Sequence, residues 1–279
     1  MHVVETVADV RRFRADLAGT WGLVPTMGFL HLGHTSLVEQ ARSENDHVGV
    51  SIFVNPTQFG PSEDLAAYPR DLEKDLGLLE QAGADLVWVP GAEEVYPPDY
   101  RTYVVVEEVT RPLEGAARPG HFRGVATVVA KLFNVFLPDR AYFGQKDAQQ
   151  AVVIRQMVRD LNFPIELVVC PIVREADGLA MSSRNVYLTP EQRAAAPVLH
   201  RALSAARDLW SSGERDGEQL RQAIRRVLDA EPLARSEYVS AADPRTLEEL
   251  GLAGRDVLLS MAVRIGKARL IDNLLLGDE

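Results

Sequence analysis

The stretch WGLVPTMGFLHLGH, residues 21–34, decides the fold of this chain. Residues 21–25 form an apolar segment of strand length, a turn containing Gly28 and Gly33 follows, and a helical pattern then runs through residues 35–41. The free backbone N–H groups and the positive dipole end of such a helix favour phosphate in the turn. We therefore predict a nucleotide site between this strand and this helix.

Two imidazoles, His31 and His34, are three residues apart and can point to the same side of the helix start. Gly28 and Gly33 lack a Cβ atom, which allows the backbone to approach a ligand closely. A zinc site is the rival interpretation, but no carboxylate or third imidazole stands nearby at a suitable spacing. The His-x-Gly-His spacing resembles the signature of the nucleotidylyl-transfer superfamily that includes class I aminoacyl-tRNA synthetases.

The composition is that of an ordered globular protein. The chain has 279 residues, 46% hydrophobic and 25% charged, enough for one large or two modest domains. The net charge of −10 argues against an extended nucleic-acid surface, since such surfaces need clustered Lys and Arg. We expect no nucleic-acid partner, whereas an anionic small substrate is compatible because local positive groups decide its binding.

No feature of the sequence predicts export or a membrane. Residues 1–6 lack a basic segment followed by an apolar run, and the longest apolar region, residues 125–137, is too short to span a bilayer. The single cysteine, Cys170, excludes an intrachain disulfide and fits a reducing compartment. We expect a cytoplasmic protein.

Apolar runs of strand length alternate with helical patterns as far as about residue 173. This alternation predicts an α/β fold, a Rossmann-like parallel sheet with helices on both faces, in an N-terminal domain of residues 1–173. A further peripheral strand is expected over residues 104–108. The predicted main strands cover residues 23–25, 47–54, 84–89, 141–143 and 165–169, and the helices 35–43, 72–81, 124–136 and 148–161.

The pattern changes after Arg174 and predicts a smaller α+β C-terminal domain of residues 174–279 that acts as a lid. Helices are expected over residues 190–210 and 218–228, and a small antiparallel sheet over residues 237–241, 257–265 and 270–276. Thr189 before Pro190 is the order expected of a helix N-cap. The hinge is expected near residues 173–178.

Two polar clusters follow other predicted strands. Asn55 and Gln58 lie at a proline turn, where they either serve the turn itself or orient a hydroxy acid. Lys146 and Asp147 repeat the order of strand, glycine, charged turn and helix. Lys146 is either a solvated lysine or a point charge on phosphate, and Gln150 would face the same cleft one turn later.

Two more donor-rich segments lie near helices or the predicted hinge. Residues 181–184 supply hydroxyl and guanidinium groups suited to triphosphate oxygens, and the alternative is a flexible linker. Residues 118–124 add positive groups that either contact a ligand or order the helix that follows.

Taken together and in order, these motifs closely resemble the pantoate–β-alanine ligase family. The resemblance implies ATP-dependent condensation of pantoate with β-alanine through a pantoyl adenylate, releasing AMP and pyrophosphate, in a homodimer whose smaller domain closes over the site. The matching segments are PTMG at 25–28 with HLGH at 31–34, FVNPTQF at 53–59, RPGHF at 118–122, FGQKD at 143–147 and MSSRN at 181–185.

By this resemblance, His31, His34 and Lys146 are the catalytic residues. Gln58 and Gln150 hold pantoate, and Asn55 lies next to the acceptor region. Mg²⁺ enters with ATP, and Asp75 is a candidate ligand for it, with an exposed helix face as the alternative interpretation. The expected nucleotide-binding residues are Met27, Gly28, Phe29, Leu30, His31, Leu32, Gly33, His34, Gly144, Gln145, Lys146, Asp147, Val173, Met181, Ser182, Ser183 and Arg184.

The chain departs from the family pattern at Leu32 and Gln145, where glutamate is usual. These departures affect local charge and remove no group with an assigned chemical role. Two other classes of function stay open at this point: a nucleotidylyltransferase that leaves AMP on its product, and a nucleotide-binding scaffold without activity.

Overall fold

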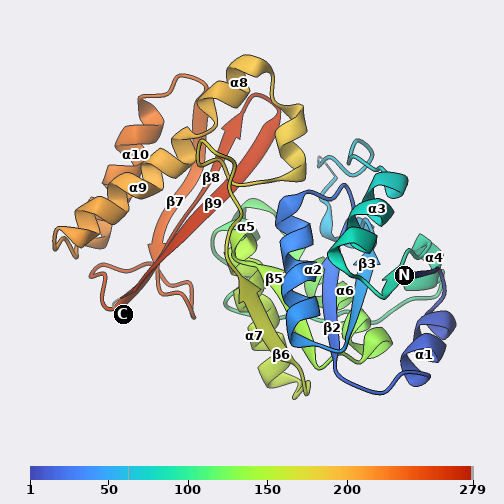
Figure 1. Cartoon of the computed structure of the whole chain (residues 1–279). Helices are drawn as coiled ribbons and strands as arrows, with labels where there is room; N and C mark the ends of the chain where they lie inside the picture. The colour runs from blue at the N-terminus through green and yellow to red at the C-terminus, as the bar shows by residue number, and fades with distance from the viewer. Residues whose placement is uncertain (62, 278–279) are drawn as a thin grey trace.

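Six parallel strands form the larger sheet, in the order β1-β4-β3-β2-β5-β6 (Figure 1). The protein is represented by a computed structural model that describes residues 1–61 and 63–277. The strands are β1 (His2–Val4), β2 (Trp21–Thr26), β3 (His47–Ile52), β4 (Leu86–Trp88), β5 (Arg140–Gly144) and β6 (Glu166–Cys170). The predicted Rossmann-like α/β architecture is confirmed.

Helices cover both faces of this sheet, which is why its strands read as nearly continuous apolar runs. Trp21 and Leu23 of β2 face α1, α6 and α7, whereas Val24 faces α2 and α3. All three side chains are at most 1% exposed. The helices of this half are α1 (Val7–Ala15), α2 (Leu32–Glu44), α3 (Leu72–Ala82), α4 (Ala92–Val95), α5 (Glu114–Ala117), α6 (His121–Phe136) and α7 (Ala148–Asp160).

The strand order places the predicted polar clusters side by side. Strands β3, β2 and β5 are neighbours, and the chain leaves β2 toward β3 on one side, while β5 occupies the other side. Ligands of open α/β sheets bind at such a switch point, outside the carboxyl ends of the strands. The loop after β2, the single turn η1 (Pro56–Gln58) after β3 and the turn η2 (Gln145–Asp147) after β5 all lie there.

A three-stranded antiparallel sheet, β7-β8-β9, forms the core of the C-terminal part. Helices α9 and α10 pack on one of its faces, and the other face looks toward the N-terminal part (Figure 1). The elements are η3 (Ser183–Tyr187), α8 (Pro190–Ala195), α9 (Val198–Ser211), α10 (Gly217–Asp229), β7 (Ala234–Ala242), β8 (Asp256–Ile265) and β9 (Ala268–Gly277).

Two expectations about single elements were wrong. Residues 104–108 alternate in burial like a strand, but β1 holds the sheet edge beside β4, and the N–H of Val104 donates to Thr127 Oγ1 on α6 instead. The helix expected over residues 190–210 is divided into α8 and α9 at Pro197, because proline has no N–H to donate and clashes with the preceding turn.

The domain boundary at residues 173 and 174 remains a prediction, with the larger sheet before it and the smaller sheet after it. Among the described residues, none of the helices is long and apolar enough to cross a bilayer.

Candidate active site

The two histidines begin helix α2 and bond to its first turn. His31 is the N-cap: its Nδ1 accepts from the N–H of Gly33 at 3.1 Å. His34 reaches back, and its Nδ1 accepts from the N–H of His31 at 3.3 Å. The ring centroids are 4.1 Å apart. A Cβ atom at position 33 would lie 3.0 Å from the His31 ring, so glycine is needed there for the ring to fold over the helix start.

These bonds fix the tautomer of both rings. Since each Nδ1 accepts a backbone N–H, the proton of each neutral ring is on Nε2, which is then a donor. Burial, and then the Lys146 charge, lower the pKa of His31 to about 4. Burial, His31 and Lys146 also lower the pKa of His34. At neutral pH both rings are therefore uncharged, and each carries an Nε2–H donor.

The turn before the histidines is held by Asp75 of α3. Gly28 and Phe29 have φ of 82° and 51°, a left-handed conformation that is unfavourable for phenylalanine. The Asp75 carboxylate accepts the N–H of Phe29 and that of Leu30, both at 2.7 Å. Asp75 is 1% exposed, so the exposed helix face considered above was wrong.

The contacts of Asp75 do not resemble a metal centre. Both of its oxygens face backbone N–H groups, and no cluster of three or more His, Cys, Asp or Glu able to hold a metal ion occurs among residues 1–61 and 63–277. Its assignment as a magnesium ligand stays a prediction that these contacts do not support. They give it instead the role of fixing the turn that leads into His31.

Lys146 lies on η2, between β5 and α7. Its Nζ is 3.6 Å from Asp147 Oδ2, and its side chain is 22% exposed. After burial, the Lys146 charge is a further cause of the lowered pKa of both histidines. Gly144 ends β5 immediately before this turn.

The segment at residues 181–184 bridges the two parts of the molecule. The N–H of Met181 donates to the Val173 carbonyl, and the Ser183 hydroxyl donates to the Phe29 carbonyl at 3.2 Å. Ser182 caps η3 by accepting the N–H of Arg184. The Arg184 guanidinium is paired with Asp64, with N–O distances of 3.0 and 3.2 Å. The segment is ordered by these bonds, so the flexible linker does not describe it.

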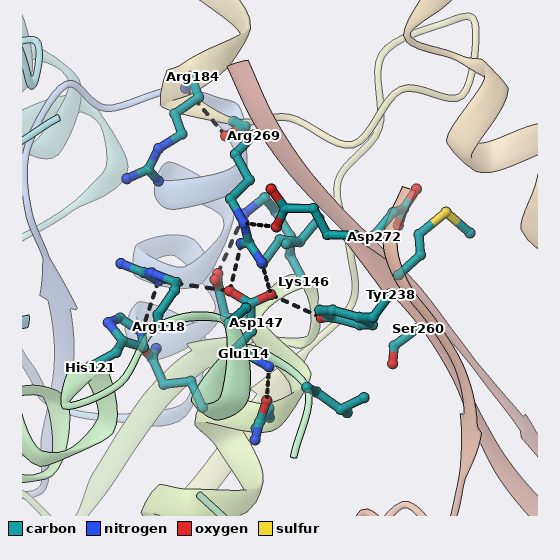
Figure 2. A pocket seen from close by; sticks show the side chains of 18 of the residues that line it. Glu114, Arg118, His121, Lys146, Asp147, Arg184, Tyr238, Ser260, Arg269 and Asp272 are labelled. Atoms are coloured by element: carbon teal, nitrogen blue, oxygen red, sulfur yellow. Dashed lines mark hydrogen bonds and ion pairs between the residues drawn. The ribbon is translucent and has the colours of Figure 1, made fainter. Parts of the chain in front are cut away.

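A cleft of about 800 Å³ runs between the two parts (Figure 2). Lys146, Asp147 and Arg184 line it, together with Gln150 and Ser182. Volumes of 300–1,000 Å³ are typical of sites for nucleotide-sized ligands. The cleft therefore brings the cationic side chains of Lys146 and Arg184 into one space.

A smaller cavity of about 180 Å³ lies beside the carboxyl ends of β2 and β3. His34, Gln58, Gln150 and Arg184 reach it, and its walls include the apolar side chains Val128, Val129, Leu132 and Phe143. Gln150 also lines the larger cleft and makes no side-chain hydrogen bond within the described part of the chain. An apolar wall with a few amide groups suits a small branched hydroxy acid.

Asn55 orients the side-chain amide of Gln58. Its Nδ2 donates to Gln58 Oε1 at 3.0 Å, while its Oδ1 accepts from Thr57 and from the Tyr96 hydroxyl. Because Gln58 Oε1 accepts this bond, its Nε2 points the other way and donates one hydrogen to the Met27 sulfur at 3.3 Å, which leaves the second hydrogen for a ligand. Asn55 is 1% exposed, and its assignment as a substrate contact stays a prediction.

Arg118 and His121 line both cavities. His121 Nδ1 lies 2.9 Å from the Gln58 carbonyl and its Nε2 lies 3.1 Å from Arg118, so Nδ1–H donates and Nε2 accepts. Burial and the Arg118 charge lower the pKa of His121 to about 4. The contacts order this segment around Gln58, and Glu63 also pairs with Arg118 at 2.7 Å.

The sequence analysis missed a buried network between the two parts. The two Nη atoms of Arg269 donate to the two carboxylate oxygens of Glu114 at 2.7 Å each, and the Tyr238 hydroxyl donates to the same carboxylate at 3.0 Å (Figure 2). Burial and Glu114 raise the pKa of Tyr238 well above its usual range. Asn273 of β9, also missed, bonds to the Lys146 turn. The adjacent polar residues Asp272 and Asn273 within an apolar strand were the one available signal.

Several predicted residues lie near the cavities without lining them. Leu32 is 64% exposed at the start of α2, where its side chain leaves the turn, and Leu30 is 2% exposed in the core. The other predicted residues that line neither cavity are Gly28, Phe29, His31, Gly33, Asp75, Gly144, Gln145, Val173, Met181 and Ser183. Backbone and packing contacts connect this set to the residues that do line the cavities.

Comparisons with known proteins agree with this arrangement. The model of the pantoate-beta-alanine ligase family matches residues 2–275. The chain is 63% identical to a pantothenate synthetase of Roseiflexus sp. over 276 residues, 99% of each chain. It is similar in structure to a pantothenate synthetase of Thermus thermophilus, with a TM-score of 0.94 and 53% identity over 98% of this chain and 99% of that one.

A second solved relative carries ligands. The pantoate-beta-alanine ligase of Francisella tularensis, in complex with beta-gamma ATP and β-alanine, is 35% identical with a TM-score of 0.81 over 99% of this chain and 97% of that one. With the family model and the high-identity relatives, these matches cover nearly the whole chain. The chain therefore belongs to the pantoate–β-alanine ligase family.

Proposed function

We propose that the cleft between the two parts joins pantoate to β-alanine with cleavage of ATP to AMP and pyrophosphate, in two successive steps. The membership of the family and the relative solved with an ATP analogue and β-alanine support this reaction. The observations that carry the proposal for this chain are the neutral Nε2–H donors of His31 and His34 at the start of α2 and the Lys146 ammonium group that lines the cleft.

In the first step, the carboxylate of pantoate attacks the α-phosphorus of ATP. A bond forms between a carboxylate oxygen and that phosphorus, the bond to the bridging oxygen breaks, and pyrophosphate leaves with the electron pair. Negative charge increases on the oxygens around the α-phosphorus and on the leaving group. Fixed donors aimed at such charge stabilise the transition state, and His31, His34 and Lys146 are our candidates for this role.

The nucleotide is held on the side of α2 and η3 in this proposal. The N-terminal end of α2 provides a positive dipole, and Ser182, Ser183 and Arg184 add hydroxyl and guanidinium donors for the triphosphate. Adenosine lies along the turn at Met27 and Gly28 and against the pair Val173 and Met181. The remaining backbone of residues 29–33 shapes this path, with Gly144, Gln145 and Asp147 near the ribose.

Pantoate occupies the smaller cavity, where its branched methyl groups pack on the wall formed by α6 and Phe143. Gln58 Nε2 and the Gln150 amide donate to its oxygens, and Asn55 keeps the Gln58 amide turned the right way. This position puts the carboxylate between the cavity and the histidines, since His34 lines the cavity as well.

In the second step, the neutral amine of β-alanine attacks the carbonyl carbon of pantoyl adenylate. The C–N bond forms, the bond from carbon to the phosphate oxygen breaks, AMP leaves, and the amine releases its proton. Holding both reactants in one closed cleft raises their effective concentration and keeps water away from the mixed anhydride. No covalent bond to the protein is needed.

Three further assignments belong to this proposal. Mg²⁺ is carried into the cleft by the ATP phosphates, as expected for an ion that keeps most of its water ligands. The chain works as a homodimer, which sedimentation analysis would test. A reducing, cytoplasmic location is consistent with its single cysteine, the buried and free Cys170.

One assay separates this proposal from the alternatives. The protein is incubated with ATP, Mg²⁺, pantoate and β-alanine, each omitted in turn, and the nucleotide products are identified. AMP release that depends on both organic substrates is expected. An AMP-bearing product would indicate a nucleotidylyltransferase, and the absence of turnover would indicate a scaffold.

The residue roles are tested in the same assay. His34→Ala and Lys146→Ala should each slow adenylate formation by about 10²-fold or more, the size of effect seen when a transition-state donor is removed. Gln58→Ala should raise the KM for pantoate more than the KM for ATP. Rates near those of the unmodified protein would refute the corresponding role.

A further inference from the structure

Asn273 reaches from β9 of the C-terminal part onto the turn that carries Lys146. Its Nδ2 donates to the backbone carbonyls of Gln145 and Lys146, both at 2.9 Å, and its Oδ1 accepts from Gln145 Nε2 at 3.0 Å. Asn273 is 3% exposed. Both of its donor hydrogens and its acceptor oxygen are thus used on two consecutive residues of η2.

The orientation of this amide is set by its partners. Reversing it would place Oδ1 against two carbonyl oxygens and Nδ2 against the Gln145 amide nitrogen, which removes every one of the three bonds. Gln145 provides the donor that completes the set. A glutamate carboxylate at this position would have no such donor.

The position of Asn273 is itself fixed from the segment between the two parts. Arg174 pairs with Asp272 at 2.7 and 2.9 Å, and Asp272 is 2% exposed. The same carboxylate accepts the N–H of Asn273 at 2.8 Å. A continuous chain of bonds therefore runs from the hinge segment through β9 to the backbone of Lys146.

We propose that Asn273 is a positioning residue: it holds the backbone of Lys146 so that the ammonium group faces the phosphate site, and it does so only while the C-terminal part is docked. This role rests on the one proposed above for Lys146. It extends the function of the C-terminal part from covering the cleft to setting the geometry of a catalytic group on the opposite part.

The test measures pantoate-dependent exchange of labelled pyrophosphate into ATP, which reports the first step alone. Asn273→Ala should lower kcat for exchange by about 10- to 100-fold, the range expected when a catalytic group is misplaced by around 1 Å. The KM for pantoate should change less than about twofold by the same reasoning, because the groups proposed to hold pantoate are untouched.

A double-mutant cycle with Lys146→Ala distinguishes positioning from general damage. If Asn273 acts through Lys146, adding Asn273→Ala to Lys146→Ala should have almost no further effect on exchange. An equal loss in both backgrounds, or no loss in Asn273→Ala alone, would overturn the proposal. Wild-type exchange in Lys146→Ala alone would instead refute the role of Lys146 while the family reaction stands.

Two further variants complete the experiment. Ser240→Ala is the matched control, because Ser240 is 0% exposed on the same face of the small sheet and its hydroxyl has no partner among the described residues. It should keep normal exchange. If Asn273→Ala fails to fold, Gln145→Met removes the bond to Oδ1 and leaves both bonds from Nδ2, and it should give a smaller loss that again disappears in the Lys146→Ala background.

Discussion

Replacing Gly124 by alanine tests how closely helix α6 supports the pantoate cavity. A Cβ atom at this position would lie 2.4 Å from the Thr57 carbonyl oxygen and 2.6 Å from the Gln58 backbone nitrogen. Both are backbone atoms of η1, so no side chain can rotate away. The helix and the turn would have to separate by about 1 Å to reach ordinary contact distance.

Two opposing effects set the size of the change in stability. Overpacking of a tight contact costs about 1–3 kcal/mol, whereas alanine in place of glycine inside a helix contributes about 1 kcal/mol. We expect a net loss of about 0–2 kcal/mol in the free energy of unfolding, measured by urea denaturation. Because η1 carries Gln58, the KM for pantoate should rise about 10-fold, which corresponds to about 1.4 kcal/mol of binding.

Gly77→Ala is the matched control for this experiment. Gly77 lies inside α3, and a Cβ atom there would meet nothing within 4 Å. That variant should gain about 0.5–1 kcal/mol in the free energy of unfolding and keep its KM values. The reasoning is refuted if Gly124→Ala is as stable as Gly77→Ala and binds pantoate normally.

The buried polar groups give three other predictions. The pKa of His31 and of His121 is about 4 in the folded protein and about 6.5 in an unfolded chain. Between these values the unfolded chain binds more protons, so the free energy of unfolding should fall as the pH drops from about 6.5 to about 4. His31→Asn should make this pH dependence less steep in urea titrations. Asp75→Asn keeps only one acceptor oxygen for the two N–H groups and should lower the free energy of unfolding by about 1.5–3 kcal/mol in denaturation experiments. It should also slow adenylate formation, and a normal unfolding free energy with a normal rate would contradict the role of Asp75 in the turn. Glu114→Gln breaks the bidentate ion pair with Arg269 and should lower the free energy of unfolding by about 2 kcal/mol or more. An unchanged unfolding curve would show that the network does not hold the two parts together.

The larger fold could be predicted because its signals are local. A strand covered by helices on both faces must be apolar throughout, as residues 21–24 are, and the glycine-containing turn that follows it indicates where the next helix begins. The failures have local causes too. Residues 104–108 have the alternation of a strand, but pairing requires a free sheet edge, and the sequence does not say that β1 has taken it.

The candidate site was predicted in part for the same reason. Motifs at the ends of strands pointed to His34, Lys146 and Gln58, which line the two cavities, because parallel strands end on one edge of a sheet; His31 lines neither cavity. The task of Asp75 could not be predicted, since an acidic residue in a helix gives no sign that it is buried against a loop over 40 residues earlier in the chain.

The sequence by itself determined the chemistry that the chain can offer: two imidazoles at a helix start, a lysine after a strand, and amides at a proline turn. Only the tertiary structure decided the state in which these groups act. Burial keeps the histidines neutral, backbone contacts leave Nε2–H as the donor, and Asn273 fixes the lysine turn from the other side of the cleft. The burial and the Asn273 bonds depend on contacts between segments remote in sequence, which form only when the chain folds, whereas the bonds that fix the tautomer lie within residues 31–34.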